Sequence, residues 1–62
     1  GNLWSNLART RLERRRLTAP DGATYALFYG ITTPDRLARL VGALRLREKL
    51  VMRKLARMGA VV

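Results

Sequence analysis

The clearest pattern in this sequence is a stripe of apolar residues along its C-terminal half. After Thr33, apolar positions recur at alternating intervals of four and three residues, which is the heptad pattern of a helix with one contact face. The residues of this face are Leu37, Leu40, Val41, Leu44, Glu48, Val51, Leu55, Met58 and Val62. Thr33-Pro34-Asp35 has the residue types of a helix start. We therefore predict one long amphipathic helix over residues 33–62, with a coiled-coil-like seam.

A single charged residue, Glu48, lies at the centre of this apolar face. Either the helix bends there and the carboxylate reaches solvent, or Glu48 pairs with an arginine of a partner helix and sets the register of the contact. The heptad spacing continues in register on both sides of Glu48, which argues for one unbroken helix face. We therefore expect a paired Glu48.

The N-terminal residues 1–17 predict a shorter, basic helix. Leu3, Trp4, Leu7 and Leu12 give it a broad apolar face, and three consecutive arginines follow. We expect Trp4, the only tryptophan of the chain, to anchor a core or an interface, because a buried indole contributes a large apolar area.

The middle of the chain, residues 18–32, allows two structures. Pro20-Asp21-Gly22 has strong turn chemistry and the residues after it favour strands, so the segments on either side of the turn would pair as a β-hairpin. Alternatively, a capping box at Thr18 starts a short helix that Gly30 ends. The Pro-Asp-Gly sequence favours the hairpin.

The same segment carries three aromatic residues, Tyr25, Phe28 and Tyr29. In so small a chain we expect them to pack into the core, although exposed aromatic rings stack on unpaired bases in single-strand and RNA binders. If the segment is helical, Gly30 and Ile31 fit the turn of a helix-turn-helix motif, but the apolar spacing of the next helix departs from that motif.

These elements predict a mainly α-helical chain that forms a single small domain over residues 1–62. A chain of 62 residues buries a limited core, and this one has no cysteine for disulfides. Because the apolar stripe is larger than so small a chain is expected to cover alone, we predict a homo-oligomer that associates through the seam.

The charge of the chain is strongly one-sided, with thirteen Lys and Arg against four Asp and Glu and a net charge of +9. A surplus of this size indicates a polyanionic partner, and arginine suits phosphate because its guanidinium is a planar fork of donors. We predict a small non-enzymatic protein that binds nucleic acid, either DNA or RNA, through its phosphates. The predicted contacts are Arg9, Arg11, Arg14, Arg15, Arg16, Arg36, Arg39, Arg47, Arg53, Lys54 and Arg57.

Several classes of function are disfavoured by the residues that the chain lacks. It has no histidine and no cysteine, and its four carboxylates are scattered, so we expect no enzyme activity, metal, cofactor or small-molecule substrate. No apolar stretch is long enough for a membrane span, and the N-terminus lacks the apolar core of a signal peptide. We therefore expect a cytoplasmic, nuclear or intravirion protein that is not secreted.

Two further interpretations have support in the sequence. The chain can be an assembly subunit of a larger complex or virion, in which the seam packs on partner helices and the arginines meet an acidic protein. Alternatively, the five residues from Gly1 to Ser5 fit the N-myristoylation pattern. Gly1 is then the lipidation site of a peripheral membrane protein, and the basic tract after it adds attraction to an anionic membrane.

Overall fold

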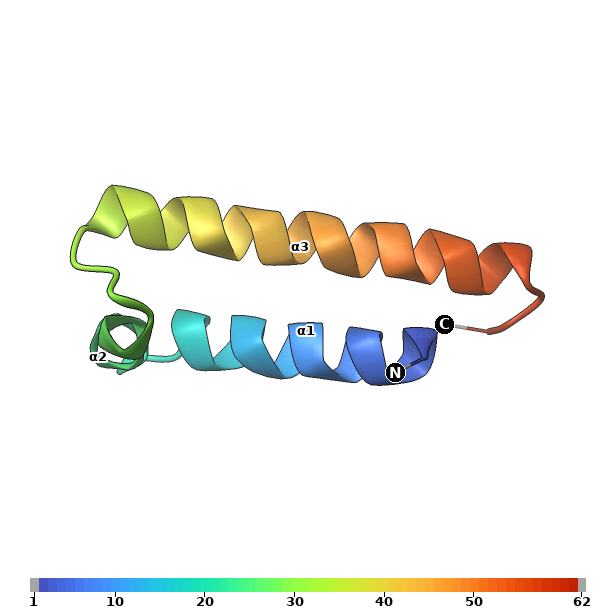
Figure 1. Cartoon of the computed structure of the whole chain (residues 1–62), viewed down its shortest axis with the longest axis horizontal. Helices are drawn as coiled ribbons and strands as arrows, with labels where there is room; N and C mark the ends of the chain where they lie inside the picture. Colours follow the sequence, from blue (N-terminus) through green and yellow to red (C-terminus); the bar gives the residue numbers. More distant parts are fainter. Residues whose placement is uncertain (1, 62) are drawn as a thin grey trace.

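Two antiparallel helices, α1 (Leu3–Thr18) and α3 (Pro34–Arg57), run side by side and form the body of the molecule (Figure 1). This computed structural model describes residues 2–61. A short helix, α2 (Gly22–Ala26), and a 3-10 turn, η1 (Leu27–Tyr29), connect the long helices at one end. The molecule is elongated, with extents of 40 × 19 × 16 Å. The mainly helical fold predicted from the sequence is confirmed, and residues 2–61 contain no strand.

Helix α1 has a defined cap at its start and a proline just after its end. The Asn2 Oδ1 accepts a hydrogen bond of 2.8 Å from the Ser5 N–H. Ala19 is extended, with φ −68° and ψ 163°, because the following residue, Pro20, disfavours helical backbone in the residue before it. The helix predicted for residues 1–17 is therefore present, and it extends one residue further, to Thr18.

The β-hairpin predicted for the middle segment is wrong. The Pro-Asp-Gly sequence does turn the chain, but it joins two helices, and the Gly22 N–H donates to the Ala19 carbonyl at 2.8 Å. The short helix of the alternative prediction is present, and Gly30 ends η1 in the left-handed conformation with φ 72°. The predicted capping box does not form, because Thr18 belongs to α1 and its hydroxyl donates to the Arg14 carbonyl at 2.8 Å.

The predicted start of the long helix is confirmed. The Thr33 Oγ1 accepts a hydrogen bond of 3.3 Å from the Arg36 N–H, and Pro34 is the first helical residue. The helix then continues without a break through Gly42. Its 24 residues give it a length of about 36 Å at 1.5 Å per residue.

The end of the long helix lies earlier than predicted, at Arg57 rather than at residue 62. Gly59 adopts φ 84°, and the Ala60 N–H donates to the Leu55 carbonyl at 3.0 Å. This is the arrangement of a Schellman cap, which turns the chain away from the helix axis. Val62, a predicted seam residue, lies outside the described residues.

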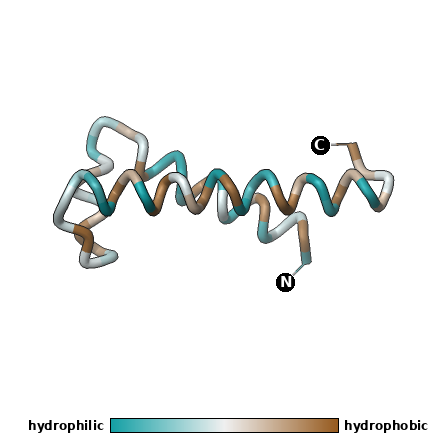
Figure 2. The backbone as a smooth tube through the Cα atoms, turned by 90° about the horizontal axis from the view of Figure 1, so that it is seen from above, coloured by the Kyte–Doolittle hydropathy of each residue, from teal (hydrophilic) through white to brown (hydrophobic). Residues whose placement is uncertain are grey.

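The apolar face of α3 packs against α1 of the same chain in two clusters. Figure 2 shows the hydrophobic residues of this face recurring among hydrophilic ones along α3. The cluster near the N-terminus consists of Leu7, Val51 and Leu55, with Leu3, Met52 and Ala60 packed against them. The cluster near α2 consists of Leu17, Ala26 and Leu44, with Tyr25, Ile31, Leu37, Leu40 and Val41 packed against them.

This packing changes the interpretation of the predicted seam. Leu44, Val51 and Leu55 are only 8%, 6% and 2% exposed within one chain, so α1 and the α2 segment of the same chain cover the stripe that was expected to need a second chain. Met58 does not take part, since it follows α3 and is 73% exposed. Association of two chains through the same residues is not shown, and it would require α1 to leave this face.

Candidate nucleic-acid interface

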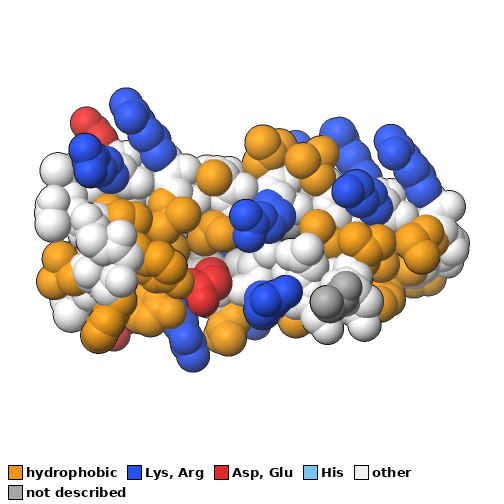
Figure 3. Space-filling view, viewed as in Figure 1, with side chains coloured by type: hydrophobic (Ala, Val, Ile, Leu, Met, Phe, Trp, Pro, Cys, Tyr) orange, Lys and Arg blue, Asp and Glu red, His pale blue; other side chains and the backbone are white. Residues whose placement is uncertain are grey.

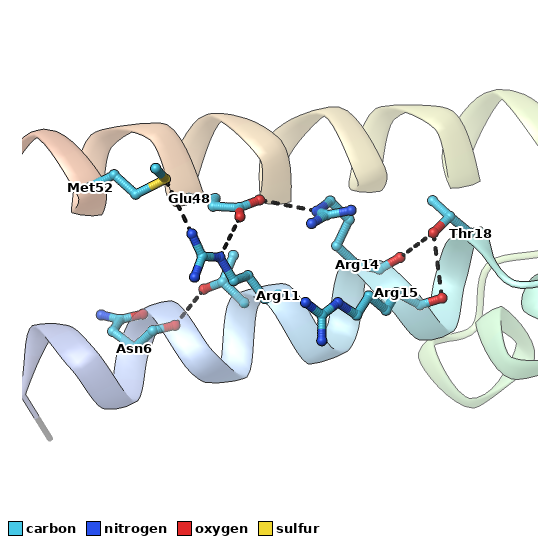
Figure 4. A network of polar contacts seen from close by, with 8 residues as sticks. Asn6, Arg11, Arg14, Arg15, Thr18, Glu48 and Met52 are labelled. Atoms are coloured by element: carbon cyan, nitrogen blue, oxygen red, sulfur yellow. Dashed lines mark hydrogen bonds and ion pairs between the residues drawn. The ribbon is translucent and has the colours of Figure 1, made fainter. Parts of the chain in front are cut away.

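One carboxylate links two arginines across the pair of long helices (Figure 4). The Arg11 Nε–H donates to Glu48 Oε2 at 2.6 Å, and the Arg14 Nε–H donates to Glu48 Oε1 at 3.0 Å. The Glu48 side chain is 16% exposed, whereas those of Arg11 and Arg14 are 35% and 24% exposed. Each carboxylate oxygen therefore has its own charged donor, and this polar layer separates the two apolar clusters.

The two arginines hold the pKa of Glu48 below its usual value. The hydrogen bond from Arg11 is the largest cause, partial burial of the carboxylate opposes it, and the hydrogen bond from Arg14 lowers the pKa further. The predicted pairing of Glu48 is confirmed, but both partners belong to α1 of the same chain and not to a second chain. Arg11 and Arg14, which were predicted to bind phosphate, are thus engaged within the protein.

The other eleven of the thirteen basic side chains are exposed and make no ion pair within residues 2–61. Arg16 has a neutral partner, because its Nη1 donates to the Tyr25 hydroxyl at 3.2 Å and its Cζ lies 5.5 Å from the centre of that ring. This hydrogen bond raises the pKa of Arg16. All eleven side chains therefore present positive charge to the solvent.

A groove of about 780 Å³ runs between α1 and α3 on one side of the helix pair. Three cations line it, Arg9 from α1 and Arg47 and Lys54 from α3. The apolar part of its lining includes Leu46 and Leu50, which are 57% and 45% exposed. The groove thus combines positive charge with exposed apolar surface.

Glu13 is the one acidic residue among those that line this groove. Its Oε2 is covered and has no hydrogen-bond partner within residues 2–61. With three cations against one carboxylate, the lining residues carry two net positive charges. The groove therefore attracts anions in spite of Glu13.

Three more arginines continue the row of cations along α3. Helical residues seven positions apart lie on the same side, two turns from each other. Arg36 and Arg39 lie seven positions before the groove residues Ala43 and Leu46. Arg57 lies seven positions after the groove residue Leu50. We call Arg9, Arg36, Arg39, Arg47, Lys54 and Arg57 the basic edge. Figure 3 shows Lys and Arg side chains standing out along both long helices, with few acidic ones between them.

Arg53, also a predicted phosphate contact, does not line this groove. It lines a shallow depression together with Arg45, Lys49 and Glu48. Arg45 and Lys49 were not among the predicted contacts, although their spacing of four residues from each other and from Arg53 places all three on one side of a helix. The predicted contacts on α3 are thus divided between two edges, and most of them belong to the basic edge.

The core packing predicted for the aromatic residues is wrong for most of them. Phe28 and Tyr29 are 86% and 46% exposed. Trp4, predicted to anchor a core or an interface, is 51% exposed and does not anchor the core of this chain. Tyr25 is half-buried, and its ring centre lies 6.0 Å from that of Phe28 and 5.7 Å from that of Tyr29. The physical reason is the shortness of α2 and η1, which turn only a few side chains inward, and Ala26 takes the buried position.

Further observations bear on the classes of function predicted from the sequence. Within residues 2–61, no cluster of acidic side chains has the arrangement that would hold a metal ion. None of the helices in this part of the chain is long and apolar enough to cross a membrane. Gly1, the predicted lipidation site, lies outside the described residues. Comparison of the chain with protein-family models, with curated proteins and with solved structures gave no match.

Proposed function

We propose that this protein binds nucleic acid through the basic edge, as a non-enzymatic protein without a cofactor. The proposal rests on one observation: three exposed cations from both long helices, Arg9, Arg47 and Lys54, line one groove whose lining includes one acid, Glu13. The other three residues of the basic edge extend this row along α3. Like charges on one edge repel one another, so their arrangement becomes favourable when a polyanion lies along it.

The dimensions of the basic edge suit a phosphate backbone. From Arg36 to Arg57 it extends over about 32 Å of helix. Five of its six residues are arginines, whose guanidinium forks donate two parallel hydrogen bonds to phosphate oxygens. Because a nucleic-acid backbone repeats its charges at short intervals, a row of cations engages it in many registers.

Base sequence is not expected to matter for this contact. Leu46 and Leu50 lie between the cations and would touch sugars and bases, but a leucine side chain has no donor or acceptor that distinguishes base edges. The phosphate backbone is common to DNA and RNA, so the proposal covers both. The expected activity is sequence-tolerant binding with a strong dependence on salt.

The test is a titration of the protein with labelled oligonucleotides of equal length and unrelated sequence, at several salt concentrations. Similar affinities are expected for all sequences, with the logarithm of affinity falling linearly with the logarithm of salt and a slope of about −5 if six phosphates are engaged. Salt-independent affinity, or no binding near physiological salt, would contradict the proposal.

Binding to two other polyanions distinguishes a nucleic-acid-binding protein from an assembly subunit and from a peripheral membrane protein. Polyglutamate stands for an acidic protein partner of an assembly subunit, and vesicles of anionic lipid stand for a membrane surface. The proposal expects oligonucleotides to bind more tightly than either at equal charge, because the counterions condensed on the closely spaced phosphates are released on binding. Tighter binding to polyglutamate or to vesicles would favour the corresponding alternative.

A further inference from the structure

The α2 end of the molecule carries apolar side chains that no other described residue covers. Leu27 and Phe28 are 58% and 86% exposed. Beside Leu27, a groove of about 430 Å³ opens between α2 and the start of α3, and none of its lining residues is charged. Ala23, Ile31 and Leu37 are among them. Figure 3 shows hydrophobic side chains covering much of this end.

The charges around this end differ from those on the rest of the surface. Asp21 and Asp35 lie at the starts of α2 and α3 and flank the apolar groove, whereas Glu13 and Glu48 lie along the contact of the long helices. Arg36 directly follows Asp35, so the α2 end presents both signs of charge. Elsewhere, the surplus of cations repels a second copy of the chain.

We propose that two copies of this chain associate through their α2 ends, with Phe28 of each copy seated in the apolar groove of the other. A projecting ring and a groove at the same end of a molecule can be self-complementary, because a two-fold axis places the ring of each copy opposite the groove of the other and closes the dimer. Asp21 and Asp35 at this end lower the repulsion between two positively charged copies. An anionic membrane is the poorer occupant, since Asp21 and Asp35 would face its negative surface.

This contact differs from the seam predicted from the sequence, because it leaves α1 in place on the apolar face of α3. It is also small: one turn and one groove bury less than the roughly 800 Å² per partner of a standard stable interface. We therefore expect a weak dimer, with a dissociation constant between micromolar and millimolar. Such a dimer joins two basic edges, so a long nucleic acid binds more tightly than a short one.

Sedimentation velocity of the whole chain over a concentration series tests this contact. The wild type shifts from monomer to dimer, and Phe28→Asp weakens dimerisation by about tenfold or more. Met58→Asp is the matched control, because Met58 is 73% exposed at the opposite end of the molecule and the charge changes equally. It dimerises like the wild type. Circular dichroism checks that both variants keep their helix content.

Cysteine cross-linking gives a second measurement, because the chain has no cysteine of its own. Thr32→Cys, in the apolar groove, is expected to cross-link two copies, and Arg57→Cys, at the end of α3, is not. A wild type that stays monomeric overturns the proposal, as does a dimer that Met58→Asp abolishes while Phe28→Asp leaves it intact. A monomer that binds anionic vesicles through Phe28 also overturns it.

Discussion

Glu48 is the residue on which the contact between the long helices depends most. It lies between the two apolar clusters and accepts one hydrogen bond each from Arg11 and Arg14. An apolar face alone permits two helices to slide by one turn, whereas a paired polar residue within it fixes one register. Because Arg11 and Arg14 are bound to Glu48, they are also less available to a polyanion.

Replacing Glu48 by alanine leaves two partly buried guanidinium groups without their acceptor. We expect Glu48→Ala to lower the free energy of unfolding by about 1–3 kcal/mol, measured by urea denaturation. Lys49→Ala, at the exposed neighbouring position, is the control and should change it by no more than about 0.5 kcal/mol. If Glu48→Ala is equally silent, the ion pair does not stabilise the helix contact.

The lowered pKa of Glu48 also predicts how stability depends on pH. A carboxyl whose pKa is depressed by folding stabilises the folded state above its unfolded value, near 4.5, and loses that contribution as the pH falls through the folded value. The difference in unfolding free energy between the wild type and Glu48→Gln should therefore be constant at neutral pH and shrink in acid. A difference that does not change with pH would show that the ionised carboxylate is not responsible.

At the scale of helices, the sequence predicts best where local signals agree. Thr33 and Pro34 start α3 as expected, and the apolar stripe marks its buried face. The middle segment fails because Pro20-Asp21-Gly22 is a turn signal that serves a hairpin and a helix link equally. Tertiary contact decides between them: Ala26 of α2 is buried against Leu17 and Leu44, and strand propensity does not register that contact.

Two glycines give opposite predictions for the stability of the helices. A Cβ on Gly22 would collide with the Leu17 carbonyl oxygen, because α2 begins against the end of α1, whereas nothing lies within 4 Å of a Cβ on Gly42. Gly22→Ala should therefore lower the free energy of unfolding by about 2 kcal/mol or more, and Gly42→Ala should raise it by about 0.5–1 kcal/mol. Thermal and urea denaturation of the two variants measure both effects. An increase for Gly22→Ala would contradict the close approach of α1 and α2.

At the scale of the whole molecule, the sequence could not show what covers the long apolar stripe. A heptad pattern has the same form whether the partner helix belongs to the same chain or to another. The broad apolar face predicted for α1 included Leu7 but not the buried Leu17, and it included Leu12, which is 47% exposed. For the same reason the arrangement of the cations was only partly predictable: Arg9 meets Arg47 and Lys54 only because α1 folds back along α3.

We propose that the arrangement of charge, and not its total, makes the protein bind nucleic acid. Two triple variants test it, since each replaces three cations of the same helix pair by glutamine and lowers the net charge equally. The first changes the groove residues Arg9, Arg47 and Lys54. The second changes the residues of the opposite edge, Arg45, Lys49 and Arg53.

The decisive measurement is the salt dependence of oligonucleotide affinity for these two variants beside the wild type. The groove variant should bind more weakly and lose about three from the magnitude of the salt slope, one for each phosphate contact. The opposite-edge variant should keep a slope within about one of the wild type. Equal losses in both variants, or a larger loss in the opposite-edge variant, would contradict binding through the basic edge.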